Sequence, residues 1–90
     1  MYEIKYTNQF KKSVKRCKKR GFKLDNLVKV VDLLQNNGQL PKKYKPHKLT
    51  GNYSNCWECH IKPDWLLIWL QDDNTLTLLF IDTGTHSDLF

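Results

Sequence analysis

Three histidines, His47, His60 and His86, are the side chains of this sequence best suited to proton transfer. His47 follows a proline, His60 alternates with apolar residues as on a strand, and His86 lies in the run T-G-T-H near the end. None of the three falls on an apolar face, where a core histidine is expected. An imidazole titrates near neutral pH and can act as a general base or a general acid. Composition alone leaves open a catalytic centre or three unrelated surface histidines.

Cleavage of RNA fits these side chains best, because the reaction needs no protein nucleophile. The ribose 2′-hydroxyl attacks the adjacent phosphorus, and the enzyme supplies a base, an acid for the 5′-oxygen and positive charge for the phosphate. Asp64 can orient or stabilise an imidazolium, and the aromatic ring of Phe90 can stack on an exposed base. These residues therefore predict a catalytic centre that cuts RNA without a metal.

A metal site or a cysteine nucleophile fits the sequence less well. Three histidines and an aspartate can bind a divalent ion, but no H-x-x-x-H or comparable spacing occurs. Cys56 and Cys59 form C-W-E-C without a second pair of soft ligands, and strand residues three apart point to opposite faces. Cys59 should face the core, where a thiol is inert. We therefore expect free thiols, no metal and no cofactor.

Positive charge is concentrated in the first half of the sequence. Residues 1–48 contain 14 Lys or Arg and three acids, whereas residues 49–90 contain one Lys and six acids. A solvated helix face can explain such a pattern, but a strongly basic half favours a polyanionic partner, and nucleic acid is the usual one. The basic side chains gather on the first predicted helix, at Lys11, Lys12, Lys15, Arg16, Lys18 and Lys19.

Hydrophobic spacing predicts an α+β fold for one domain, residues 1–90. We expect an antiparallel sheet with an N-terminal helical hairpin on one face, in the order β-α-α-β-β-β. The predicted elements are a strand at 2–6, a helix capped by Thr7 and ended by Gly21, a second helix from Leu24 to the N-N-G at 36–38, an ordered loop at 40–51, and strands at 56–61, 65–70 and 75–81. The nearly all-apolar strand 65–70 should be central and covered on both faces.

We expect a cytoplasmic location, because the sequence shows neither a membrane-spanning segment nor a signal peptide. The sequence has no apolar run of the ~20 residues that span a bilayer, and it opens with no signal-peptide pattern.

Three motifs, in this order, resemble those of one bacterial family. The strings K-P-H-K-L-T-G, E-C-H-I-K-P-D-W-L-L-I-W and T-G-T-H-S-D-L-F are similar to those of the YafQ branch of the RelE/ParE-type toxins, the toxin halves of type II toxin–antitoxin pairs. The resemblance covers the whole sequence. It implies a RelE-like fold and a metal-independent endoribonuclease that enters the ribosomal A site, cuts messenger RNA to a 2′,3′-cyclic phosphate and pairs with an antitoxin protein.

The resemblance also implies roles for single residues. His86 would be the general acid and His47 or His60 the base, with Asp64 supporting them. Phe90 would hold a base of the codon, and Trp65 of the P-D-W motif would contact the substrate. The basic first helix would meet ribosomal RNA.

Two family arginines are replaced in this sequence, by Trp57 and by Asp82. The charge that holds the phosphate would then have to come from Lys45, Lys48 or Lys62, or from a protonated histidine, and lysine lacks the bidentate fork of arginine. Two other functions therefore stay open: a RelE-fold module that binds a ribosome or an antitoxin with weak or no nuclease activity, and a generic nucleic-acid-binding domain.

Overall fold

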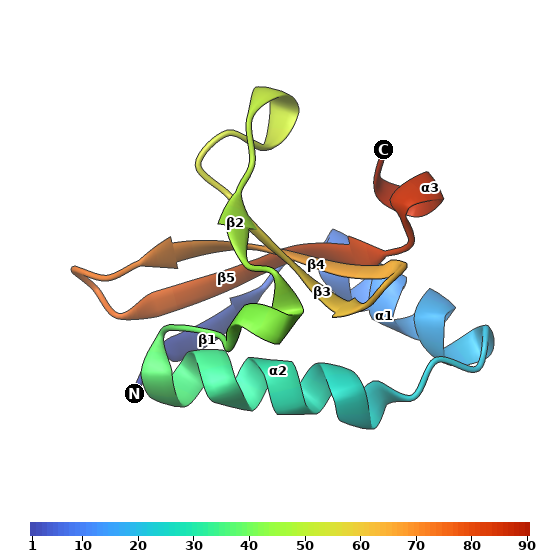
Figure 1. Cartoon of the computed structure of the whole chain (residues 1–90), viewed down its shortest axis with the longest axis horizontal. Coiled ribbons are helices and arrows are strands. Elements are labelled where there is room, and N and C mark those ends of the chain that lie inside the picture. The colour runs from blue at the N-terminus through green and yellow to red at the C-terminus, as the bar shows by residue number, and fades with distance from the viewer.

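The computed structural model describes residues 1–90. It contains a five-stranded sheet with two helices packed on one of its faces (Figure 1). In chain order the elements are β1 (Glu3–Tyr6), α1 (Asn8–Lys19), α2 (Leu24–Asn37), the 3-10 turn η1 (Lys42–Tyr44), β2 (His47–Lys48), the 3-10 turn η2 (Gly51–Tyr53), β3 (Trp57–Lys62), β4 (Trp65–Asp72), β5 (Thr77–Gly84) and α3 (His86–Leu89). The strands are arranged β1-β5-β4-β3-β2. The predicted α+β class is confirmed. None of the helices is long and apolar enough to cross a membrane.

The sheet is mixed, which corrects the prediction of a wholly antiparallel one. β3, β4 and β5 pair antiparallel, but β1 runs parallel to β5, with Ile4 opposite Leu78. Alternation predicts that residues 2–6 form a strand, and it contains no information on the direction or the partner of that strand. The partner is the last strand of the chain, so only the folded structure reveals the pairing.

Two short elements lie in segments that the sequence predicts to be irregular. The loop predicted at 40–51 contains β2, which pairs with the start of β3 so that His47 lies opposite Glu58. The last residues form α3, a single turn that follows β5 directly. Both elements are too short for hydrophobic periodicity to reveal them.

The ends of α1 and α2 lie where the sequence predicts. Thr7 caps α1 by accepting a hydrogen bond of 2.9 Å from the backbone N–H of Phe10. Gly38 ends α2 in the left-handed conformation, with φ of 66°, and a Cβ at this position would lie 2.6 Å from the hydroxyl of Tyr2. Glycine is therefore required here for both its backbone angle and its lack of a side chain.

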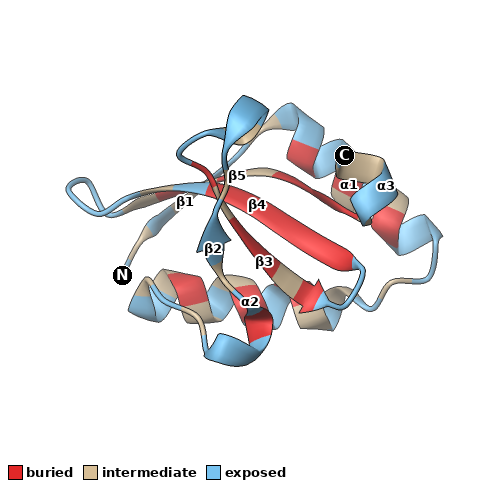
Figure 2. Cartoon of the chain, turned by 45° about the horizontal axis from the view of Figure 1, so that its top comes forward, coloured by how far each residue is buried: buried red, intermediate tan, exposed pale blue.

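The hydrophobic core fills the space between the helices and the sheet. Its fully buried side chains include Val30 and Leu34 of α2, Leu67 and Trp69 of β4, and Phe80 of β5. The predicted central strand is confirmed, since β4 has a neighbour on each side and its buried residues form the red stripe in Figure 2.

The three cysteines are free, and all three are buried, which was predicted for Cys59. Burial raises the pKa of the Cys59 thiol to about 12. A thiol in this state carries almost no thiolate at neutral pH and is no nucleophile.

The second face of the sheet is covered by shorter segments. In Figure 1, α2 lies below the sheet and α1 is drawn behind it, whereas the segment of β2 and η2 and the helix α3 lie above it. Both long helices contribute to the same core. Leu66 and Ile68 of β4 point to this upper face, opposite to the core residues Leu67 and Trp69, and both are fully buried.

Replacing Leu67 by alanine should lower the free energy of unfolding by about 2–5 kcal/mol, because it leaves a cavity in the strand covered on both faces. Leu70→Ala is the matched control on the same strand, since Leu70 is 37% exposed and should lose well under half as much. Urea unfolding followed by tryptophan fluorescence gives both values. Equal losses for the two variants would contradict the assignment of β4 as the centre of the core.

Candidate active site

The three predicted histidines come together on the upper face of the sheet. His47 lies on β2, His60 on β3, and His86 is the first residue of α3. The ring centroids of His47 and His60 are 6.4 Å apart, and those of His60 and His86 are 5.8 Å apart. His60 therefore lies near the imidazoles of two other segments, and neighbouring rings are close enough to reach different oxygens of one phosphodiester group.

Asp64 fixes the ring of His86. One carboxylate oxygen accepts hydrogen bonds from Nδ1 of His86, at 2.6 Å, and from its backbone N–H, at 2.9 Å. These bonds, that of the backbone N–H first, hold the pKa of Asp64 below its usual value. An ionised carboxylate accepts and does not donate, so Nδ1 of His86 carries a proton, and Nε2 has no hydrogen bond within the chain.

The cap of α3 holds His86 in place. Asp88 and Thr85 form a capping box, in which the hydroxyl of Thr85 accepts from the N–H of Asp88 and the carboxylate of Asp88 accepts from the N–H of Thr85. Arg20, the C-cap residue of α1, donates two further hydrogen bonds to Asp88, at 2.6 and 3.1 Å. The bonds from Arg20, followed by that from Thr85, hold the pKa of Asp88 well below its usual range. The basic helix α1 therefore positions His86 through Asp88.

Gly84 allows this cap to close against the end of β5. A Cβ at Gly84 would lie 2.8 Å from a carboxylate oxygen of Asp88 and 3.1 Å from the guanidinium of Arg16. The glycine of the T-G-T-H run is therefore part of the support of His86.

Both ring nitrogens of His47 have partners. Nδ1 lies 2.9 Å from the backbone carbonyl of Lys45, and Nε2 lies 3.2 Å from Oε1 of Glu58. Glu58 was not predicted as a site residue, because an acid on a strand normally faces water. Its place two residues before His60 is the signal that could have found it, since such residues share one face of a strand. Glu58 is 5% exposed.

Two aromatic rings meet at the end of α3. Phe90 is 68% exposed, and its ring lies edge-on to Tyr53 of η2, with the centroids 5.8 Å apart. Phe90 follows the helix that carries His86, so its exposed ring lies on the same short segment as that histidine. Tyr53 was not predicted, since nothing in the sequence links it to the C-terminus.

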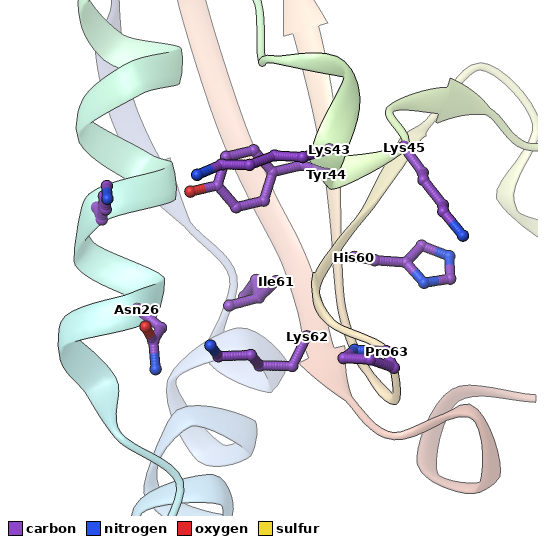
Figure 3. Close-up of a pocket in the computed structure, with 9 residues that line it drawn as sticks. Asn26, Lys43, Tyr44, Lys45, His60, Ile61, Lys62 and Pro63 are labelled. Atoms are coloured by element: carbon purple, nitrogen blue, oxygen red, sulfur yellow. The ribbon is translucent and has the colours of Figure 1, made fainter.

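Of the lysines predicted to bind the phosphate, Lys45 lies at the histidines. Figure 3 shows its side chain extending toward the ring of His60, whereas Lys62 extends toward α2. The ammonium of Lys48 lies over the ring of Trp57, 5.7 Å from its centroid, and Trp57 packs against the core on the helix side of the sheet. Lys48 and Lys62 therefore point away from the three imidazoles.

A basic cavity of about 410 Å³ lies beside the free edge of β3. It lies between α2, η1 and β3, reaches His60 and contains four lysines and no carboxylate (Figure 3); its lining consists of Asn26, Lys29, Lys43, Tyr44, Lys45, His60, Ile61, Lys62 and Pro63. Such a cavity attracts anions.

Trp65 and Asp82 serve the fold and lie outside the site. Trp65 is 3% exposed, and its indole N–H donates a hydrogen bond of 3.0 Å to the hydroxyl of Thr83, so the structure does not bring it to the substrate side. Asp82, which replaces a family arginine, accepts a hydrogen bond of 2.5 Å from the hydroxyl of Ser13. This buried bond ties α1 to β5.

The model of the YafQ family, described as the bacterial toxin of a type II toxin–antitoxin system, matches residues 2–90. This chain belongs to the YafQ family. The mRNA interferase toxin YafQ of Escherichia coli K12 is 39% identical over 89 residues, which are 98% of this chain and 95% of that protein. The prediction of a type II toxin is confirmed, and the curated relatives of the family confirm the predicted class of enzyme, an endoribonuclease.

Solved structures of family members agree with the fold along its whole length. The E. coli DinJ–YafQ complex contains a chain 38% identical to this one, with a TM-score of 0.90 over 100% of this chain and 99% of that chain. A metal-bound toxin from Helicobacter pylori is 40% identical, also with a TM-score of 0.90, and each chain is fully covered.

Asp88→Asn should loosen α3 while keeping the size of the side chain. Loss of the cap and of the bonds to Arg20 should lower the free energy of unfolding by about 1 kcal/mol at neutral pH. Because the pKa of Asp88 is lower in the folded chain than in the unfolded one, this stabilisation is present above the ordinary value of 3.8 and is lost as the pH falls below it.

The check is urea unfolding at neutral and at acid pH, with amide exchange of residues 85–90 as the local measurement. Asp32→Asn on the exposed side of α2 is the control and should change neither. A difference between Asp88→Asn and the wild type that grows on acidification would show that the carboxylate of Asp88 does not act in this way.

Proposed function

We propose that this toxin cuts messenger RNA on the ribosome by moving protons between its histidines and the RNA. The observation that carries the proposal is the meeting of His47, His60 and His86 at one position, with Asp64 bonded to His86. The 2′-oxygen bonds to the phosphorus, the bond to the 5′-oxygen breaks, and the RNA is left with a 2′,3′-cyclic phosphate.

His86 is the general acid in this reaction. Asp64 holds Nδ1, so Nε2 presents its proton to the 5′-oxygen as that oxygen leaves. A neutral imidazole, of His47 or His60, takes the proton of the 2′-hydroxyl. Each turnover therefore moves one proton onto one histidine and one proton off another, and water restores both.

Phosphates on either side of the cut are held by lysines. Lys45 extends toward His60, and the basic cavity beside β3 continues from this point with Lys29, Lys43 and Lys62 (Figure 3). A strand of RNA that passes His60 can place a neighbouring phosphate there. The exposed ring of Phe90 stacks on a base of the codon.

The basic face of α1 binds ribosomal RNA. Lys11, Lys12, Lys15, Lys18 and Lys19 are exposed along this helix, whereas the guanidinium of Arg16 turns inward toward Asp88 and the carbonyl of Thr83. Because the substrate is messenger RNA on ribosomes, the toxin acts in the cytoplasm. The same positive surface suits an antitoxin with an acidic segment, and the E. coli relative has been solved with its antitoxin DinJ.

No step of this mechanism is assigned to a metal ion. The H. pylori relative is described as metal-bound. In this chain no group of three or more His, Cys, Asp or Glu side chains has an arrangement that could hold a metal ion.

A binding module that cuts little or nothing is the second candidate function. Its supporting observation is that Trp57 and Asp82, at the positions of the two family arginines, are used in packing and in the bond to Ser13. New 5′ ends within codons, mapped by primer extension on messages from induced cells, separate an enzyme from such a module.

His86→Ala should abolish growth arrest after induced expression and should lower ribosome-dependent cleavage by about 10²–10⁴-fold, the usual loss when a general acid is removed. The fold should persist, since His86 is exposed on a single helical turn. A folded His86→Ala variant that still arrests growth would contradict the assignment of the acid.

Replacing Lys11, Lys15 and Lys18 of α1 by glutamine should weaken ribosome binding and make it less sensitive to salt, because fewer counterions are released. Sedimentation with 70S ribosomes over a range of KCl measures this slope. Replacing Lys5, Lys23 and Lys42, which lie outside α1, is the control of equal charge. Equal losses in the two triple variants would mean that binding follows net charge and not the helix.

A further inference from the structure

Glu58 is a buried carboxylate with a single polar partner. It is 5% exposed, Oε1 lies 3.2 Å from Nε2 of His47, and Oε2 is buried without any hydrogen bond. Asp82, the other buried acid, differs because it accepts bonds from the hydroxyl of Ser13 and the N–H of Thr83. A buried carboxylate with so few donors is costly unless its partner is positively charged.

The partners of His47 decide its protonation. The carbonyl of Lys45, 2.9 Å from Nδ1, has no hydrogen to donate, so Nδ1 must carry a proton. An ionised carboxylate of Glu58, with Oε1 3.2 Å from Nε2, is likewise an acceptor, so this contact is favourable when Nε2 carries a proton. With both nitrogens facing acceptors, His47 has no free lone pair for the 2′-hydroxyl proton.

We propose that Glu58 holds His47 as an imidazolium whose charge faces the phosphate, and that His60 is therefore the general base. This division of roles rests on the proposed ribonuclease function. His60 fits the base, because neither of its ring nitrogens has a hydrogen bond within the chain and it lies between the other two imidazoles.

Proton movement balances in this scheme. His60 takes the 2′-hydroxyl proton as the bond from the 2′-oxygen to phosphorus forms, and His86 gives its Nε2 proton to the 5′-oxygen as the old bond breaks. His47 keeps its proton throughout. Glu58 is a positioning residue, because its burial keeps it from the RNA and it acts through His47.

The scheme also provides positive charge for the phosphate. A phosphate that gains negative charge during cleavage is stabilised by a fixed cation beside it. His47 can provide it, because its side chain is 48% exposed while the carboxylate that holds it is buried. Lys45, which extends toward His60 in Figure 3, adds to the same positive potential.

The charge of His47 is tested directly by NMR of the free toxin labelled with ¹⁵N at histidine, at neutral pH. The wild type should show both ring nitrogens of His47 protonated. Glu58→Gln removes the negative charge and keeps the shape, so it should convert His47 to a neutral ring with the proton on Nδ1. Glu3→Gln, the same change on exposed β1, should leave His47 unaltered. A wild-type His47 with an unprotonated Nε2 overturns the proposal.

Activity is measured as single-turnover cleavage of messenger RNA on purified ribosomes. Glu58→Gln and His47→Gln should each lower the rate by about 10–100-fold, and the double variant should lose no more than His47→Gln alone. His60→Gln should lower it by about 10²–10⁴-fold. A larger loss for His47→Gln than for His60→Gln, or fully additive losses at 47 and 58, contradicts the proposal.

The two measurements separate this inference from the proposed function. If the wild type cuts no message, the ribonuclease function fails, whereas the NMR result still decides whether Glu58 holds His47 as a cation. If the wild type cuts and His47 is neutral, the ribonuclease function stands and the division of roles fails.

Discussion

Burial of β4 on both faces is the constraint on which the rest of the structure depends. Each residue from Trp65 to Trp69 is no more than 3% exposed, so neither face of this strand can meet water. The helices α1 and α2 cover one face, and their apolar side chains pack against those of the sheet to form the core. The other face needs a cover too, and β2, η2 and α3 lie over it (Figure 1). These covering segments carry His47 and His86, so the burial of an apolar strand also assembles the site around His60.

A second set of interactions links the basic helix α1 to His86, the proposed general acid. Ser13 of α1 donates to buried Asp82 of β5, and one turn and two turns further along Arg16 and Arg20 face Asp88 of α3. The outer face of the same helix is covered with lysines. A polyanion that binds α1 therefore lies on an element that also sets the position of His86. In the proposed mechanism, this arrangement couples RNA binding and catalysis through a single helix.

The site contains two pairs of a carboxylate and an imidazole, and their environments differ. Asp64 and His86 are both well exposed, and their short bond leaves Nε2 open to the RNA. Glu58 is buried beneath His47 and occupies the nitrogen that a base would use. Histidine can serve as acid, base or fixed cation, and the carboxylate next to each ring distinguishes these roles. His60 has no carboxylate partner, which fits the role of general base that we propose for it.

The sequence by itself determined the longer helices and strands and the chemistry available. The cap at Thr7, the left-handed end at Gly38 and the alternation that separates His60 from Cys59 depend on neighbouring residues, so they can be derived locally. The tertiary structure alone decided the parallel pairing of β1, the burial of Glu58 against His47, the inward turn of Trp65 and the directions of Lys48 and Lys62. These features depend on contacts between segments far apart in the chain. A local pattern indicates which residues lie on the same face of a helix or strand. Only the packing of distant segments determines what covers that face.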